Sequence, residues 1–181
     1  IYLQTDATQA INYVPINVEK LGVDLMSWNS AKIYGPKGVG ALYVRRGTPV
    51  SKIMFGGDQE SGLRPGTENV SGAVAMAKAM TVAESIKEKE LMRLTKLQDY
   101  FFIKLEGLSK TILGSSLVVN GDRVQRLPNN INITIPNIPS DLLVIELSAR
   151  GVMASAKSAC KSGDGKASYV IQATSPNTSE T

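Results

Sequence analysis

The sequence predicts an α/β fold with a parallel-type sheet, followed by a smaller α+β domain. Three observations predict this class. Residues 1–5 and 23–28 are predicted strands on either side of a short helical turn, which favours a parallel pair. The β-branched and aromatic run at residues 41–44 predicts a further strand. After a long helical pattern, short strands and helices alternate again.

The first predicted strand ends at Asp6, and Gln9 follows one turn later. Ligands of α/β sheets bind beyond the carboxyl ends of the strands, so Asp6 stands where a binding site is expected. An aspartate after a strand also commonly caps a helix or forms a turn, and this is the alternative for Asp6. Residues 17–22 then predict a helical turn that leads into the second strand.

Lys32 lies in the connection between the second and third predicted strands, in the segment NSAKIYGPKGVGALYVRR at residues 29–46. Gly35, Gly38 and Gly40 allow the backbone of this connection to approach another group closely. We expect tight surroundings that desolvate the lysine, lower its pKa and make it an amine nucleophile. The alternative is an ordinary surface lysine ahead of a hairpin turn.

A long loop rich in glycine and polar residues, residues 47–66, separates the third strand from the helical pattern. Loops of this length are usually functional or disordered. Thr67 ends the loop, and we predict that it is the N-cap of the following helix, with Glu68 in the first turn. A helix N-terminus of this kind is suited to binding an anion, whereas capping alone needs no ligand.

Residues 70–105 carry the spacing of an amphipathic helix, and Gly107 is predicted to end it. A Thr-x-x-Glu pattern at residues 81–84 predicts a second helix start. We therefore place a domain boundary there. Residues 1–82 are expected to form the C-terminal part of a larger domain, and residues 83–181 a small domain.

The small domain is predicted to contain a strand at residues 117–119, a second within residues 129–136, and a capped amphipathic helix at residues 140–150. Cys160, the one cysteine of the chain, follows in a loop rich in Ser, Gly and Lys. Because nearby lysines favour the thiolate, this cysteine is a candidate nucleophile. The alternative is a loop cysteine without a chemical role.

Composition narrows the chemistry. The 181 residues, 43% of them hydrophobic, suffice to bury a core. The chain has no histidine, so it lacks the commonest general base and zinc ligand, and no metal site is predicted. A mild net charge of +4, with acids interspersed among the bases, predicts no nucleic-acid binding. With no membrane-length apolar run, no signal peptide and a single cysteine, we expect a cytoplasmic protein.

Four motifs occur in a fixed order along the chain: DATQ at residues 6–9, KIYGPKGVGALYVRRG at 32–47, RPGTENV at 64–70 and SACKSG at 158–163. Together they resemble the cysteine desulfurases, which are pyridoxal-phosphate enzymes of the class V aminotransferase group. The resemblance extends from Ile1 to about Ala173. It implies the type I fold of pyridoxal-phosphate transferases and removal of sulfur from L-cysteine.

The resemblance also implies roles for single residues. Lys32 would hold the cofactor as a Schiff base and move the α-proton of the substrate. Asp6 would keep the pyridine nitrogen protonated, and Gln9 would hydrogen-bond the phenolic oxygen of the ring. Thr67 would donate to the phosphate of a neighbouring subunit in a homodimer. Cys160 would attack the sulfur of the substrate cysteine, giving alanine and an enzyme persulfide.

The sequence departs from the family beside the lysine. Asn29 and Ala31 occupy positions where the family commonly has Ser or Thr and His, and Ser30 is a possible substitute donor to the cofactor phosphate. The resemblance further implies segments before Ile1 and after Thr181, and a sulfur-acceptor protein such as an iron-sulfur scaffold. The alternatives are a related class V enzyme, such as a selenocysteine lyase or transaminase, and a non-catalytic truncated remnant.

Overall fold

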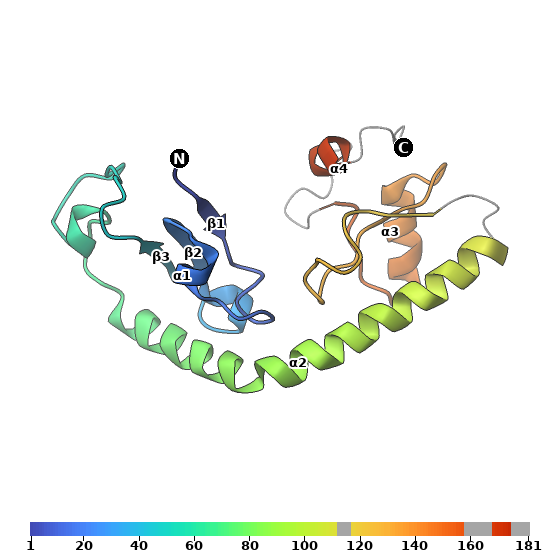
Figure 1. Cartoon of the computed structure of the whole chain (residues 1–181), viewed down its shortest axis with the longest axis horizontal. Coiled ribbons are helices and arrows are strands. Elements are labelled where there is room, and N and C mark those ends of the chain that lie inside the picture. The colour runs from blue at the N-terminus through green and yellow to red at the C-terminus, as the bar shows by residue number, and fades with distance from the viewer. Residues whose placement is uncertain (112–116, 158–167, 175–181) are drawn as a thin grey trace. The chain divides into compact units, whose positions relative to one another are not determined.

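The computed structural model describes residues 1–111, 117–157 and 168–174 (Figure 1). The chain divides into two compact units, Ile1–Thr95 and Lys96–Thr181. This division falls within a single long helix, as does the boundary expected after residue 82, so the domain assignment stays a prediction.

The first unit contains a three-stranded sheet in the order β1 (Gln4–Asp6), β2 (Leu25–Asn29) and β3 (Gly40–Val44). The strands β1 and β2 are parallel, as predicted, whereas β3 runs antiparallel to β2. The connection at residues 30–39 is shorter than the dozen or so residues that a parallel crossover needs. The sheet is therefore mixed rather than purely parallel.

The predicted helical turn before β2 is confirmed as α1 (Val18–Leu21). Its N-cap is Asn17, whose Oδ1 accepts a hydrogen bond from the Lys20 N–H at 2.9 Å. Gly22 ends the turn with a φ of 66°, in the left-handed region that glycine adopts without strain. A small core of buried apolar side chains, to which α1 contributes Val18, lies against the sheet: Ala7, Val23 and Met26, with Ala10, Ile16, Val18, Trp28 and Tyr43 packed around them.

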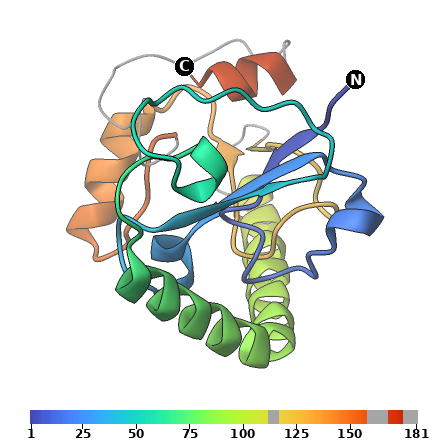
Figure 2. The ribbon, with the colours of Figure 1, turned by 90° about the vertical axis from the view of Figure 1, so that its left-hand side faces the viewer.

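The helix α2 (Val70–Thr111) begins at the predicted residue but with a different cap. The Oδ1 atom of Asn69 accepts a hydrogen bond from the Gly72 N–H at 3.0 Å, which is the N-cap contact. The predictions that Thr67 caps this helix and that Glu68 lies in its first turn are therefore wrong. Figure 2 shows the first turns of α2, in green, running below the strands of this unit.

The same helix is unbroken over 42 residues. The hydroxyl of Thr81 donates to the Ala77 carbonyl at 3.0 Å, one turn back in the helix, instead of capping a new helix. Gly107 lies inside α2 and does not end it. Both predicted interruptions are wrong, because neighbouring turns of a helix satisfy their own backbone groups wherever side chains permit.

The second unit contains the antiparallel pair β4 (Val118–Val119) and β5 (Ile133–Thr134), followed by α3 (Ser140–Ala149) and α4 (Tyr169–Thr174). The predicted strands and the helix at residues 140–150 are confirmed, although Pro139 precedes α3 and no side chain caps it. No helix in the described ranges has both the length and the apolar composition needed to cross a membrane.

Candidate active site

Asp6 and Asn29 end β1 and β2, and since these strands are parallel, both residues lie at the same edge of the sheet. Asp6 is exposed, and its Oδ1 accepts a hydrogen bond from the Thr8 N–H at 2.9 Å. Hydrogen bonds from the Thr8 side chain and then its backbone lower the pKa of Asp6 below the usual range. Asp6 is thus an ionised carboxylate at the edge where ligands of α/β sheets bind.

Gln9 is exposed in the turn that follows β1. The turn is fixed at its start, because the Ala7 N–H donates to the Ser27 carbonyl on β2 at 2.8 Å. It then closes on itself, with the Ala10 N–H donating to the Ala7 carbonyl at 2.9 Å. Gln9 therefore lies on a turn that backbone hydrogen bonds fix beyond the carboxyl end of β1. Its contact with a cofactor ring stays a prediction.

Lys32 lies in a single turn of 3-10 helix, Ser30–Ile33, directly after β2. Its backbone is held from both sides. The Lys32 N–H donates to Oδ1 of Asn29 at 3.1 Å, and its carbonyl accepts from Nδ2 of Asn12 at 2.7 Å. Asn12 belongs to the segment after β1, so this contact fixes the lysine relative to the strand that ends at Asp6. Sequence reasoning missed Asn12.

The side chain of Lys32 is exposed, as is that of the neighbouring Ala31. The tight surroundings expected around the lysine enclose its backbone and not its amine. The prediction that the amine is desolvated is therefore wrong. The alternative, an exposed lysine in the connection between two antiparallel strands, also fits this geometry. Lys32 thus has a fixed backbone and an accessible side-chain amine, which suits covalent attachment of an incoming carbonyl compound.

Ser30, expected to donate to a phosphate, has an exposed fraction of 0%. Its Oγ finds no hydrogen-bond partner among the described residues. Asn29 beside it is half-buried and caps the lysine turn through Oδ1. Of these two residues, Asn29 is therefore partly accessible to a phosphate and Ser30 is not.

Thr67 is exposed and lies in the loop before α2. The loop is braced, because Oε1 of Gln59 accepts a hydrogen bond from the Gly66 N–H at 3.1 Å. Glu60 and Ser61 both have positive φ values, of 50° and 58°, which non-glycine residues seldom adopt. Backbone strain of this kind collects at functional sites, so the loop that presents Thr67 remains a candidate phosphate-binding element.

Cys160 and Lys161 lie outside the described residues, so their roles stay predictions. The last described residue before them is Lys157, the other lysine that flanks the cysteine loop.

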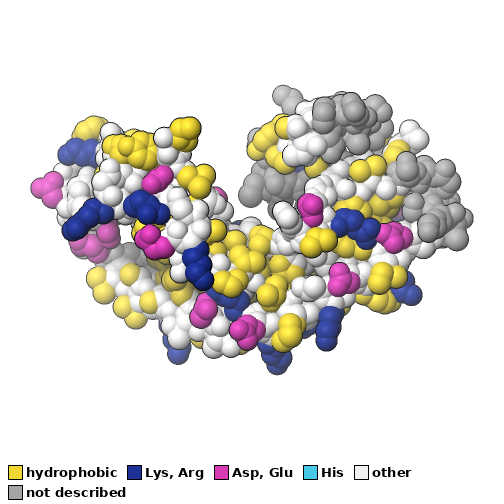
Figure 3. Space-filling model, viewed as in Figure 1, with side chains coloured by type: hydrophobic (Ala, Val, Ile, Leu, Met, Phe, Trp, Pro, Cys, Tyr) yellow, Lys and Arg dark blue, Asp and Glu magenta, His cyan; other side chains and the backbone are white. Residues whose placement is uncertain are grey.

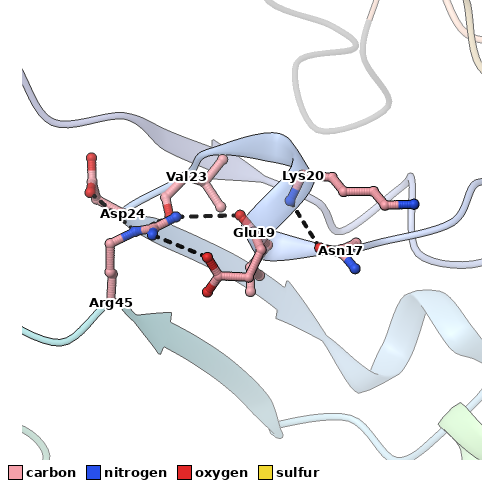
Figure 4. Close-up of polar contacts among 7 residues, drawn as sticks. Asn17, Glu19, Lys20, Val23, Asp24 and Arg45 are labelled. Atoms are coloured by element: carbon pink, nitrogen blue, oxygen red, sulfur yellow. Dashed lines mark hydrogen bonds and ion pairs between the residues drawn. The ribbon is translucent and has the colours of Figure 1, made fainter.

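At the opposite end of the β2–β3 pair, Arg45 forms a network of contacts with the beginning of β2 and with α1 (Figure 4). Its Nη2 donates to the Val23 carbonyl at 2.9 Å and to the Val18 carbonyl at 3.4 Å. It also forms ion pairs with Glu19 and Asp24, each at 3.5 Å. This side chain joins three segments of the first unit and has a structural role.

The model of the family described as aminotransferase class V matches residues 1–173. A protein named cysteine desulfurase IscS from Dictyoglomus turgidum is 45% identical over 173 residues, which cover 96% of this chain and 43% of that relative. A protein of the same name from Methanosarcina thermophila is 43% identical over 173 residues, covering 96% of this chain and 41% of its own length.

Solved structures agree. One titled NifS-like protein aligns with a TM-score of 0.74 at 35% identity and covers 85% of this chain and 40% of its own. A NifS-like protein from Rickettsia africae gives 0.75 at 28% identity, covering 85% and 41%. The chain therefore spans less than half the length of these relatives, and the expected type I fold is confirmed for the part it covers. The chain belongs to the class V aminotransferase family.

Proposed function

We propose that this chain is the part of a cysteine desulfurase that carries the cofactor lysine and the sulfur-accepting cysteine. The observation that carries the proposal is the shared edge of β1 and β2, where an ionised Asp6 ends β1 and an accessible Lys32 follows β2. The identity of 45% to a relative named cysteine desulfurase supports the choice of reaction within the family.

The donor set at this edge fits pyridoxal phosphate. Asp6 supplies the carboxylate that a protonated pyridine nitrogen needs, and Lys32 supplies a primary amine for the aldehyde. When bound, pyridoxal phosphate acts as an electron sink for the α-carbon of an amino acid. The Lys32 amine would bind the aldehyde carbon and, once released, accept the α-proton of the substrate.

Asn29 is our proposed donor to the cofactor phosphate in place of the usual Ser or Thr. Its Oδ1 is committed as an acceptor to the Lys32 N–H, which sets the orientation of the amide. The remaining group, the Nδ2 amide nitrogen, can only donate hydrogen bonds, and a fully ionised phosphate can only accept them. Asn29 would therefore serve as cap and ligand together, whereas Ser30 is buried and takes neither role.

Cys160 is proposed as the nucleophile that takes the sulfur. Its thiolate would attack the sulfur of L-cysteine, forming an S–S bond as the substrate C–S bond breaks. The electron pair of the broken bond returns to the carbon framework, and a proton replaces the sulfur to give alanine. The persulfide would then pass its outer sulfur to an acceptor protein, such as an iron-sulfur scaffold.

A homodimer is proposed as the complete form, with Thr67 reaching the phosphate site of a second copy. Exposed apolar side chains on the loop that leads to Thr67 support this. Ile53 is 89% and Phe55 is 81% exposed, and Figure 3 shows hydrophobic side chains on the surface of this unit. Apolar surface of this kind marks protein–protein contacts.

Ala31 favours a second candidate, a protein that keeps the fold without turnover. It is exposed beside Lys32, at the position where the family commonly has a histidine. A methyl group can neither hydrogen-bond to a cofactor phosphate nor exchange a proton, so an inactive relative would tolerate it.

Mass spectrometry of Cys160 distinguishes the candidates. After incubation with pyridoxal phosphate and L-cysteine, the desulfurase proposal expects one added sulfur on the Cys160 peptide. Cys160→Ser is the matched control and should carry none. A protein that binds the cofactor but gains no sulfur on this peptide would be a different class V enzyme or the non-catalytic form.

A further inference from the structure

Gly35 leaves no room for a side chain. A Cβ built at this position would stand 2.1 Å from Oγ of Ser30, 3.0 Å from Cβ of Ala79 and 3.2 Å from the Ser30 carbonyl oxygen. Its φ lies outside the left-handed region, so backbone conformation alone does not require glycine here. The requirement for glycine at position 35 therefore comes from close packing against Ser30.

Ser30 is held in this contact from several directions. Its N–H donates to the Val39 carbonyl at 2.9 Å, and its carbonyl accepts from the Gly35 N–H at 3.0 Å. Its side chain is completely buried, with an Oγ that has no described partner, and such an atom costs stability. The hydroxyl thus fills space beside Gly35 and forms no hydrogen bond with the part of the chain that the structure describes.

The helix α2 supplies the far side of the contact. Gly72, Met76 and Ala79 are spaced as neighbours along one helix face. A Cβ at Gly72 would stand 2.6 Å from Cγ2 of Val39, and Met76 is 5% exposed. The connection between β2 and β3 therefore rests on small residues of α2 at both Val39 and Gly35.

Ser30 begins the turn that carries Lys32, two residues away. A shift of Ser30 would therefore shift the backbone that the Asn29 and Asn12 side chains hold around the lysine. We propose that Ser30 and Gly35 are positioning residues for Lys32: their direct contact, backed by Ala79, fixes the turn from which the lysine amine extends. This inference rests on the proposed role of Lys32 as the amine that binds pyridoxal phosphate.

The test measures how selectively pyridoxal phosphate labels Lys32. The protein is incubated with the cofactor and reduced with borohydride, and peptide mass spectrometry gives the ratio of label on Lys32 to label on Lys37. Both lysines are exposed in the same connection, so unfolding would equalise them. Gly35→Ala should lower this ratio by about tenfold or more, because small misplacements of a reacting group are costly.

Relief of the overlap should restore the selectivity. In the double variant Ser30→Ala, Gly35→Ala, the atom at 2.1 Å is gone, and the Lys32-to-Lys37 ratio should return towards the wild-type value. Gly107→Ala is the matched control, since a Cβ there meets nothing within 4 Å, and it should keep the wild-type ratio.

A wild-type ratio in Gly35→Ala, or a double variant as low as the single one, would overturn the inference. If Gly35→Ala does not fold, Ala79→Val adds volume against Gly35 from α2 and should also lower the Lys32-to-Lys37 ratio. An unchanged ratio in this variant would equally overturn the inference. A wild-type protein with no preference for Lys32 would instead refute the proposed function.

Discussion

The two ends of the β2–β3 pair each carry a basic residue, and the structure uses them in opposite ways. Arg45 directs its guanidinium at two backbone carbonyls and two carboxylates of neighbouring segments. Lys32 has its backbone held by Asn29 and Asn12, while its side chain is exposed. The cationic group of Arg45 is engaged in contacts that stabilise the fold. For Lys32 only the backbone is fixed, and the amine is left accessible for a reaction.

Because of this difference, substitutions can separate the two kinds of residue. Removal of the Arg45 side chain should lower the free energy of unfolding, whereas removal of the Lys32 side chain should abolish the reaction. Each position has a neighbour of the same type that serves as a control: Lys37, which is exposed like Lys32, and Arg46, which is exposed whereas Arg45 is half-buried.

The largest expected effect is that of Lys32→Met on sulfur release from cysteine, which should be lost completely, because no other amine would bind the cofactor. The free energy of unfolding should change by less than about 0.5 kcal/mol, since the side chain is exposed. Sulfide release and urea unfolding measure the two quantities. Lys37→Met should retain activity. Equal losses of activity in both variants would contradict the specific role of Lys32.

The next effect is that of Asp6→Asn on the same reaction. The amide keeps an acceptor for the Thr8 N–H but removes the charge that holds a proton on the pyridine nitrogen. Loss of the α-proton of the substrate should slow by about a hundredfold or more, as for other groups that act on proton transfer. Exchange of the α-proton with deuterated solvent reports this step, and an unchanged rate would make Asp6 a turn residue only.

Arg45→Met should produce the reverse pattern to Lys32→Met. The loss of charged hydrogen bonds to the Val23 and Val18 carbonyls should lower the free energy of unfolding by about 1–2 kcal/mol. Thermal unfolding should move down by a few degrees, with the label on Lys32 unchanged. Arg46→Met is the control. A stable Arg45→Met protein would show that the network adds nothing to the fold.

The smallest effect concerns acid stability. The folded state lowers the pKa of Asp6, so this carboxylate adds stability above the unfolded pKa of about 4. That stability is lost as the pH falls through the lower folded-state pKa. Asp6→Asn should therefore be less sensitive to acid than the wild type, measured by urea unfolding at a series of pH values. Parallel curves for the two proteins would contradict the assigned cause.

Local features of the fold could be predicted because short segments encode them. The helical turn α1 has its cap in Asn17 and its stop in Gly22, both within the predicted range. The cap of α2 could not be chosen this way, because Thr67 and Asn69 are both cap residues. Asn69 is the cap in the structure, and the packing of Gly72 against Val39 fixes where the helix meets the connection.

The candidate site was predictable as a set of residues but not as an arrangement. Lys32 and Asp6 follow predicted strands, so their shared edge follows from the parallel pairing of β1 and β2. The hydrogen bond from Asn12 to Lys32 joins residues 20 positions apart, and Gly35 packs closely against both Ser30 and Ala79 of α2. Such contacts arise from packing, which no local pattern reports.

The most direct test of the account is the distribution of pyridoxal label over the lysines of the wild-type protein. Folded protein is incubated with pyridoxal phosphate, reduced with borohydride and digested, and each lysine peptide is quantified. The account predicts that the label concentrates on Lys32, while Lys37 and the lysines of α2 carry little. Label on Lys37, or label spread evenly over the exposed lysines, would contradict it.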